Sequence, residues 1–214
     1  MPTTPILCVL GTADGVGKTT VAAGLVRCAR ALGGHPVGMK PVDTRARYDD
    51  GHDLLSTDGD VLRAARGAPL PPLVACPYRV ASALPPLEAL RAAGVALELS
   101  HLESAIRTAS GYGDVVIVEL PGAGDAPLAE DGGAFDLAVR LEARVLVVGL
   151  PGHEPIEPVL SDARRRGLVA FGLTNRASPQ HPGWTLGEHA HEAAIDAELA
   201  EQRVLERCFA PASH

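Results

Sequence analysis

Two kinds of apolar pattern alternate along this chain. Short, largely continuous apolar runs predict strands that are buried on both faces of a parallel sheet. These runs are Ile6–Leu10, His35–Met39, Asp114–Glu119, Ala143–Leu150 and Leu168–Thr174. Other segments repeat apolar residues at the three- to four-residue spacing of a helix. They are Lys18–Leu32, Thr57–Ala65, Leu97–Ser110, Glu157–Arg166 and Gly187–Gln202.

The order of these elements predicts the fold class. Strands that alternate with helices are typical of right-handed βαβ units, which build a sheet with helices on both faces. The proline- and alanine-rich segment Pro69–Leu90 predicts an irregular excursion, and Arg203–Phe209 is expected to form a last strand. The chain has no internal repeat, low-complexity segment or convincing linker. We therefore expect an α/β fold with a doubly wound, mostly parallel sheet, in a single domain over residues 1–214.

The composition of the chain argues against several classes of binding partner. The 214 residues carry a net charge of −7, and the basic residues are scattered, which argues against a nucleic-acid partner. The apolar runs are too short to cross a bilayer, and the N-terminus lacks the pattern of a signal peptide. The four cysteines are widely spaced, in no metal-ligand pattern. We expect reduced thiols in a cytoplasmic protein that binds no membrane.

A glycine-rich segment between the first strand and the first helix carries the strongest chemical signal. Residues 11–20 have the sequence Gly-Thr-Ala-Asp-Gly-Val-Gly-Lys-Thr-Thr. In such a P-loop, backbone N–H groups and a helix N-terminus bind phosphates, the lysine reaches the β- and γ-phosphates, and the hydroxyl after it binds Mg²⁺. The first glycine lies one residue earlier than in the usual pattern. We predict a P-loop NTPase-like fold that binds ATP through Asp14, Gly15, Val16, Gly17, Lys18, Thr19 and Thr20.

A carboxylate is expected to complete the magnesium site. Glu119 ends a buried apolar run, at the sheet edge where ligands bind in open parallel sheets. Asp58 and Asp60 are further candidates, although an aspartate near a helix start is also an ordinary cap. The sequence leaves open which of these two aspartates is the ligand.

Segments beyond the P-loop indicate a family. Residues 39–44 read Met-Lys-Pro-Val-Asp-Thr, after the P-loop helix. With the P-loop, this segment resembles dethiobiotin synthetase, a family in which a second lysine opens a Lys-Pro-Val segment at this spacing. The resemblance covers about residues 4–210. It extends to Ser56-Thr57-Asp58, Cys76-Pro77-Tyr78, Val118-Glu119, Pro127-Leu128 and Thr174-Asn175.

The resemblance implies an ATP-dependent ring closure. In that reaction a diamine, 7,8-diaminopelargonate, reacts with CO₂ to form a carbamate. The carbamate attacks the γ-phosphate of ATP, and the second amine then closes a cyclic urea. The resemblance makes Lys18, Lys40 and Thr44 catalytic, with Lys40 between the carbamate and the γ-phosphate and Thr44 bonded to the substrate. Asn175 is implied to recognise adenine. Thr19, Asp58 and Glu119 are implied to ligate Mg²⁺.

The same resemblance implies a homodimer whose interface, around Gly149–Glu157, completes each substrate site. Here this region carries Glu154 and Glu157, which would repel a substrate carboxylate. Asp14 stands where the family has a hydroxyl, so its charge should weaken phosphate binding unless a cation compensates it. Pro121 removes a backbone donor after the metal glutamate. The adenine loop has no clear counterpart, unless Arg203–Pro211 replaces it.

These differences leave alternatives open. The chain is expected to be a dethiobiotin synthase, but it fits also a related ATP-dependent ligase that acts on another amine or acid. A ligase of the amidotransferase type would need a glutaminase domain, which this sequence lacks. A nucleotide-binding homologue without activity is the third reading. A switch of the partitioning type would carry an early P-loop lysine, and residues 12–15 contain none.

Overall fold

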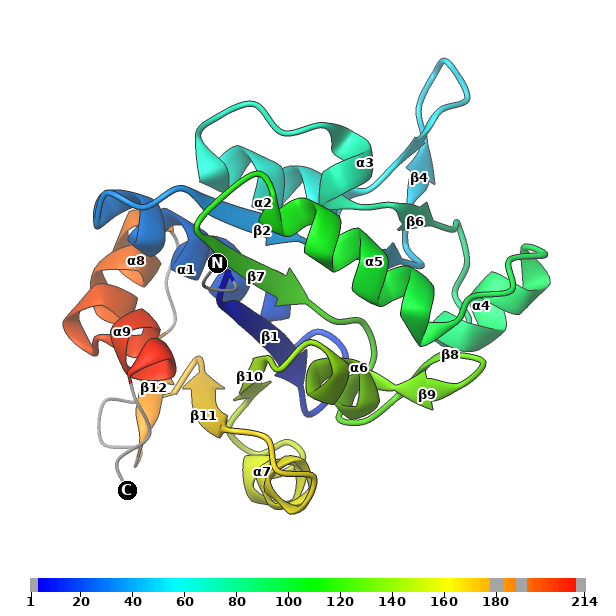
Figure 1. Ribbon diagram of the computed structural model, residues 1–214. Helices are drawn as coiled ribbons and strands as arrows, with labels where there is room; N and C mark the ends of the chain where they lie inside the picture. The colour runs from blue at the N-terminus through cyan, green and yellow to red at the C-terminus, as the bar shows by residue number, and fades with distance from the viewer. Residues whose placement is uncertain (1–3, 178–182, 188–191, 211–214) are drawn as a thin grey trace.

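The computed structural model describes residues 4–177, 183–187 and 192–210. Its centre is a six-stranded sheet with the order β12-β11-β10-β1-β7-β2, in which each pair of neighbours is parallel. The expected mostly parallel sheet is therefore confirmed (Figure 1). The strands are β1 (Ile6–Gly11), β2 (Pro36–Met39), β7 (Val115–Glu119), β10 (Arg144–Gly149), β11 (Ala170–Asn175) and β12 (Trp184–Leu186).

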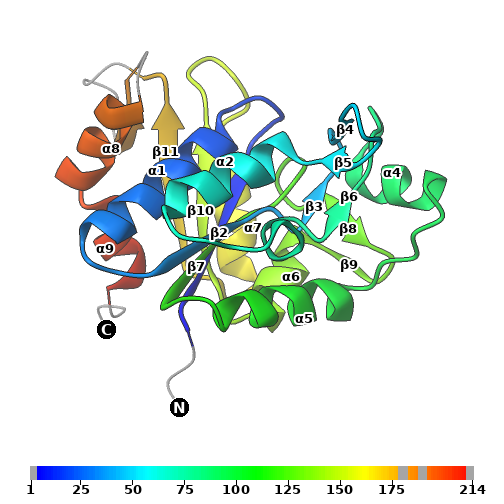
Figure 2. The ribbon, with the colours of Figure 1, turned by 90° about the horizontal axis from the view of Figure 1, so that it is seen from above.

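Helices cover both faces of this sheet, as Figure 2 shows from above. Each face has its own apolar cluster, because strand side chains alternate between the two faces. One face packs against α1 (Lys18–Ala31), α2 (Thr57–Arg66), α8 (Glu192–Glu201) and α9 (Val204–Phe209). The other packs against α5 (Leu99–Ser110), α6 (Ala134–Arg140) and α7 (Ile156–Arg165). The predicted helix Gly187–Gln202 corresponds to α8, but residues 188–191 lie outside the described part.

The segment Pro69–Leu90 is more regular than its composition predicted. It contains α3 (Pro72–Ala75), β6 (Tyr78–Arg79) and the start of α4 (Pro86–Ala92). Both helices begin at a proline, whose fixed φ and missing N–H suit the first helical position. Small two-stranded sheets complete the fold around this segment. They pair β3 (Val42–Asp43) with β6, β4 (Arg47–Tyr48) with β5 (Leu54–Leu55), and β8 (Pro127–Ala129) with β9 (Gly132–Gly133).

The prediction of a last strand at Arg203–Phe209 is wrong, because this segment forms α9. Its buried residues Val204, Leu205 and Cys208 recur at helical spacing and pack against the sheet. Arg144 in β10 donates to the carbonyl of Cys208 at 2.6 Å, so it satisfies an acceptor at the helix end. The sixth strand of the sheet is instead β12, a short edge strand that the sequence pattern did not reveal.

The parallel register aligns the carboxyl ends of three central strands. Val9 in β1 lies opposite Glu119, the last residue of β7, and Met39, the last residue of β2, lies opposite Val118. Residues that follow these strand ends therefore meet at one edge of the sheet. In the described residues, no helix is long and apolar enough to cross a membrane.

Candidate active site

The P-loop connects β1 to α1 at this edge. Gly17 caps the helix with φ at 92°, and a Cβ atom there would lie 2.2 Å from Nδ2 of Asn175, so only glycine fits. Asn175, at the end of β11, donates from Nδ2 to the carbonyl oxygen of Val16 at 2.9 Å. The first turn of α1 carries no acidic residue, so its positive end faces the loop uncompensated. This geometry suits an anion.

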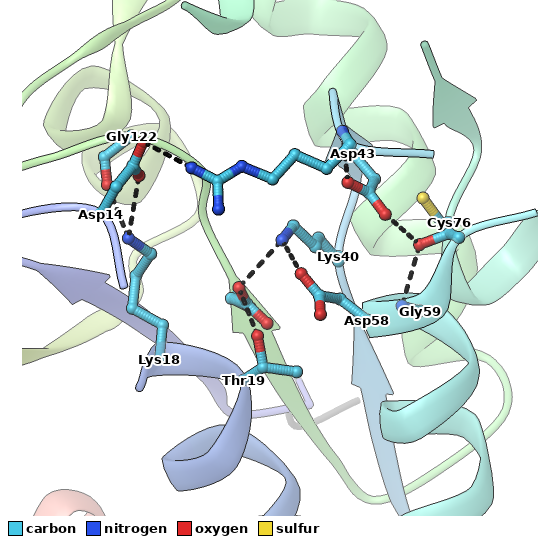
Figure 3. A network of polar contacts seen from close by, with 12 residues as sticks. Asp14, Lys18, Thr19, Lys40, Asp43, Asp58, Gly59, Cys76 and Gly122 are labelled. Atoms are coloured by element: carbon cyan, nitrogen blue, oxygen red, sulfur yellow. Dashed lines mark hydrogen bonds and ion pairs between the residues drawn. The ribbon is translucent and has the colours of Figure 1, made fainter. Parts of the chain in front are cut away.

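Lys18, the first residue of α1, is buried with 7% of its surface exposed. Its ammonium group donates to the carbonyl oxygens of Ala13 at 3.2 Å and Gly122 at 2.8 Å (Figure 3). Burial lowers the pKa of Lys18, while the charges of Asp14 and Glu119 oppose that shift. The hydrogen-bond acceptors of this ammonium are neutral carbonyls, so a phosphate oxygen would be a stronger acceptor for it.

A second polar cluster lies beside the P-loop, where β2 and β7 end. Lys40 directly follows β2, and its ammonium group binds the carboxylate of Asp58 and lies 3.1 Å from Oε1 of Glu119. Thr19 donates its hydroxyl to the same Glu119 oxygen at 3.0 Å. Figure 3 shows Thr19, Lys40 and Asp58 pointing toward one another from α1, the end of β2 and α2. Tertiary structure thus brings together the residues predicted to surround the γ-phosphate and the metal.

Burial sets the electrostatics of this cluster. Glu119 is 1% exposed, and burial raises its pKa although the charge of Lys40 opposes the shift. Burial alone would lower the pKa of Lys40, but the charges of Glu119 and Asp58 raise it above its usual range. The lysine therefore stays protonated, and it compensates part of the negative charge of the two carboxylates.

The cluster also fits a divalent cation with oxygen ligands. Oε2 of Glu119 is buried and has no hydrogen-bond partner in the described residues. A buried, unpaired carboxylate oxygen is costly, and a hard cation would satisfy it. In the described part of the chain, no group of three or more His, Cys, Asp or Glu could hold a metal ion. Magnesium does not need such a group, because it usually keeps waters and takes phosphate oxygens.

The structure separates the two aspartates that the sequence left open. Asp58 lines the same cavity as Lys40, whereas Asp60 forms an ion pair with Arg63 at 2.9 Å on α2. Asp58 is held in place through the start of its helix. The hydroxyl of Ser56 caps α2 by accepting from the N–H of a residue in the first turn at 2.9 Å. Asp58, not Asp60, is therefore the aspartate that faces the site.

A buried carboxylate joins the two halves of this cluster. Asp43, 2% exposed, accepts from the Ser56 hydroxyl at 2.6 Å and from the backbone N–H of Arg45 at 2.9 Å. It therefore ties the segment that follows β2 to the start of α2. Sequence reasoning missed Asp43, although its place within the Lys-Pro-Val-Asp-Thr segment could have indicated it.

These groups line one cavity of about 740 Å³. Two predicted binding residues, Val16 and Asn175, are not part of the wall that the described residues form, because Val16 is buried in the core and Asn175 lies beneath the P-loop. The wall includes Asp14, Gly15, Gly17, Lys18, Thr19, Thr20, Lys40, Thr44, Arg45, Asp58, Leu84, Pro85, Glu119, Pro121, Gly122, Glu154 and Arg176.

Comparison with known proteins shows the family to which this chain belongs. A protein-family model described as an AAA domain matches residues 6–166. The ATP-dependent dethiobiotin synthetase BioD of Anaeromyxobacter dehalogenans (strain 2CP-C) is 37% identical over 179 residues, which cover 81% of this chain and 78% of that protein. BioD of Mycobacterium avium (strain 104) is 37% identical over 205 residues, which cover 94% and 86%. The chain belongs to the dethiobiotin synthetase family.

Solved structures agree on the fold alone. The MinC:MinD cell division protein complex of Aquifex aeolicus superposes with a TM-score of 0.52 at 13% identity, and the match covers 98% of this chain and 99% of that chain. The signal recognition particle receptor FtsY of Elizabethkingia anophelis, in complex with GDP, gives a TM-score of 0.50 at 14% identity, covering 92% and 64%. These likenesses support the P-loop NTPase-like α/β fold expected from the sequence.

The positions at which this chain differs from the dethiobiotin synthetase pattern fall into two groups. Asp14, Pro121 and Glu154 line the cavity. Glu157 is not among the described residues of its wall, and it pairs with Arg164 at 3.2 Å instead. Of the two glutamates, Glu154 alone lies in the cavity wall formed by the described residues, and its repulsion of a substrate carboxylate stays a prediction. The region 203–211 forms α9 up to residue 209, and residue 211 lies outside the described residues.

Two arginines in the cavity wall were not predicted. Arg45 follows Thr44 directly, so the Lys-Pro-Val-Asp-Thr segment could have drawn attention to it. Arg176 follows Asn175 and has φ at 53°, a conformation that is uncommon outside glycine. Its position directly after Asn175, which the family resemblance implicated, could have drawn attention to it.

Proposed function

We propose that this chain is an ATP-dependent dethiobiotin synthase, which closes a cyclic urea from 7,8-diaminopelargonate and CO₂. The observation that carries the proposal is the position of Lys40. It leaves β2 beside the P-loop and faces Glu119, in a chain that is 37% identical to proteins named ATP-dependent dethiobiotin synthetase. A cation at that point is suited to a reaction in which two anions must approach each other.

The proposed reaction has three bond-forming steps. One amine nitrogen attacks CO₂, loses a proton and becomes a carbamate. A carbamate oxygen then attacks the γ-phosphorus of ATP, and ADP leaves with the electrons of the broken bond. The second amine attacks the carbonyl carbon of the mixed anhydride and loses a proton, phosphate leaves with the electrons of the broken C–O bond, and the five-membered urea ring closes. Phosphoryl transfer of this kind depends mainly on positioning and on compensation of negative charge.

The chain's own residues fit these demands. The P-loop amides and Lys18 would hold the triphosphate, with the phosphates replacing the carbonyl acceptors of Ala13 and Gly122. Lys40 would offset the charges of the carbamate and the γ-phosphate. Thr44 lines the cavity next to these groups and is half-buried, so its hydroxyl can orient an amine or a carbamate oxygen.

Magnesium would be held by Thr19, Asp58 and Glu119. The fit rests on the unpaired, buried Oε2 of Glu119 and on the exclusively oxygen character of the three donors. When bound, Mg²⁺ supplies positive charge that stabilises the phosphate oxygens during transfer.

Asn175 is proposed to serve both the P-loop and the base. Its amide donates to Val16 and accepts from the backbone N–H of Arg176 at 3.0 Å. A carboxamide has two donor hydrogens and two acceptor lone pairs, so a second donor and a second acceptor site remain for the edge of adenine. This geometry supports the contact with the P-loop, whereas adenine recognition rests on the family resemblance, because Asn175 is buried and is not among the described residues of the cavity wall.

The proposal also includes a homodimeric assembly and a cytoplasmic location. A homodimer in which Gly149–Glu157 completes the partner's substrate site is supported by the exposure of residues 151–155 beside the cavity. Cytoplasmic location is supported by four free, buried cysteines, since disulfides are typical of oxidising compartments. All of these roles fit a single domain, because one sheet carries the P-loop and the strand ends around it.

A coupled assay tests the proposal directly. Phosphate release should require ATP, 7,8-diaminopelargonate and bicarbonate together, and mass spectrometry should detect dethiobiotin. Hydrolysis that is stimulated by a different amine or acid, with no response to diaminopelargonate, would assign the chain to a related ligase. Nucleotide binding without turnover under any of these conditions would show that activity has been lost.

A further inference from the structure

The P-loop of this chain contains an anion beside its phosphate-binding lysine. Oδ1 of Asp14 lies 3.7 Å from Nζ of Lys18, and the Asp14 side chain lines the cavity with 65% of its surface exposed. A carboxylate at this position repels the phosphates that Lys18 attracts. A working P-loop with such a residue therefore requires a compensating cation.

Arg45 provides that cation from a different part of the chain. Its Nη2 lies 3.2 Å from Oδ2 of Asp14, across the cavity from the segment that follows β2. The backbone of Arg45 is firmly held, because its N–H donates to the buried Asp43 and it forms an isolated antiparallel bridge with Ala81. A fixed backbone at this distance lets the long side chain reach the P-loop.

Folding stability does not explain this ion pair. Both side chains are about two-thirds exposed, and exposed pairs contribute little to stability. The two lysines of the cavity wall, Lys18 and Lys40, already have partners. Lys18 donates to two carbonyls, and Lys40 binds Asp58 and Glu119.

We propose that Arg45 determines nucleotide binding by compensating Asp14 at the γ-phosphate end of the P-loop. The two residues form a matched pair, so Arg45 is needed because Asp14 is present. The guanidinium has five N–H donors and uses one on Asp14, which leaves others for a phosphate oxygen. Since Arg45 reaches the loop from the side of Thr44 and not from α1, its effect should concern the terminal phosphate more than the inner ones.

The inference rests on the proposed function only in so far as the P-loop must bind a nucleoside triphosphate. Its test therefore measures binding and not ring closure. Calorimetry would give dissociation constants for a non-hydrolysable ATP analogue and for ADP, both with Mg²⁺. The proteins are the wild type, Arg45→Ala, Asp14→Asn and the double variant. Thermal unfolding checks that each variant is folded.

Arg45→Ala should weaken binding of the ATP analogue by about tenfold or more, because an uncompensated carboxylate then faces the phosphates. Binding of ADP should change by less than about threefold on the same scale. The decisive result is rescue. Adding Asp14→Asn to Arg45→Ala should return the analogue's affinity to within about threefold of the wild type, because the variant loop no longer needs the cation.

A matched pair elsewhere provides the control. Asp162 and Arg165 on α7 are 3.0 Å apart and lie outside the cavity wall formed by the described residues. Asp162→Asn and Arg165→Ala, alone or together, should leave both dissociation constants unchanged.

Three results would overturn the inference: normal affinity in Arg45→Ala, equal weakening of ADP and the ATP analogue, or a double variant no better than Arg45→Ala. The proposed function is judged separately. A wild type that makes dethiobiotin but shows no rescue would refute the matched pair alone. Rescue in a protein that makes no dethiobiotin would refute the function alone.

Discussion

The cavity wall combines residues at strand ends with residues in loops, and these two regions are fixed in different ways. The P-loop, Lys40 and Glu119 follow or end the adjacent strands β1, β2 and β7, and the parallel register aligns these ends. Pro121 and Glu154 come from loops beyond β7 and β10. Strand ends are fixed by the hydrogen bonds of the whole sheet, whereas loops change with little cost to the fold. The differences from the family pattern are concentrated in such loops, including the P-loop position of Asp14.

The charged pairs of the cavity wall also differ in burial. The Lys40–Glu119 pair is buried, so removing Lys40 leaves the Glu119 carboxylate without an ion-pair partner in a region of low polarity. Asp14 and Arg45 are exposed, so water screens their charges. The comparison predicts large effects from the buried charged groups, which include Lys18, and smaller effects from the exposed ones.

The largest effect is expected from Lys18→Ala. The triphosphate would lose its principal cation, so kcat/KM should fall by about a thousandfold or more. Steady-state kinetics with varied ATP would measure this loss, and circular dichroism would confirm that the fold is intact. An unchanged kcat/KM would remove the P-loop from the mechanism.

Lys40→Ala should reduce turnover about a hundredfold, with a much smaller change in nucleotide affinity. The charge of Lys40 is needed mainly as the phosphoryl group transfers, and interactions of that kind affect kcat more than binding. Single-turnover kinetics and calorimetry separate the two quantities. If affinity falls as much as kcat, Lys40 binds the ground state and the proposed role is wrong.

Glu119→Gln should raise the Mg²⁺ concentration at half-maximal activity by roughly tenfold, the scale on which single partners of a metal site act. The substitution keeps the shape of the side chain but replaces an anionic ligand with a neutral one. A magnesium titration at fixed ATP would measure the midpoint. Asp60→Asn is the matched control and should leave the midpoint unchanged, because Asp60 pairs with Arg63.

The smallest effect is expected from Glu154→Gln, which should tighten binding of 7,8-diaminopelargonate by about threefold, since an exposed charge is screened. The cause is reduced repulsion of the substrate carboxylate from the cavity wall. Calorimetry would measure the dissociation constant of 7,8-diaminopelargonate for the wild type, for this variant of the cavity wall and for the surface variant Glu157→Gln. Glu157 pairs with Arg164, so its replacement should change nothing. Equal affinity in all three proteins would mean that the carboxylate binds elsewhere.

Local patterns in the sequence were sufficient for the principal strands and helices. Buried strands such as Val115–Glu119 are continuous apolar runs, and α1 shows a clear helical period after the P-loop. The pattern failed for the last predicted strand, because Val204, Leu205 and Cys208 are too few to distinguish a short strand from a short helix. It also failed for β12, whose three residues at the sheet edge have no distinctive period.

The sequence by itself determined the chemistry of this protein, because the phosphate loop and the Lys-Pro-Val-Asp-Thr segment are each continuous in the chain. Only the tertiary structure decided which distant side chains act together. It brought Lys40 to Glu119, chose Asp58 over Asp60, turned Glu157 away from the cavity and set Arg45 against Asp14. The physical reason is that the hydrogen-bonded register of the sheet and the packing of the helices fix these distances. Both depend on contacts between segments that are far apart in the chain, so local sequence patterns do not reveal them.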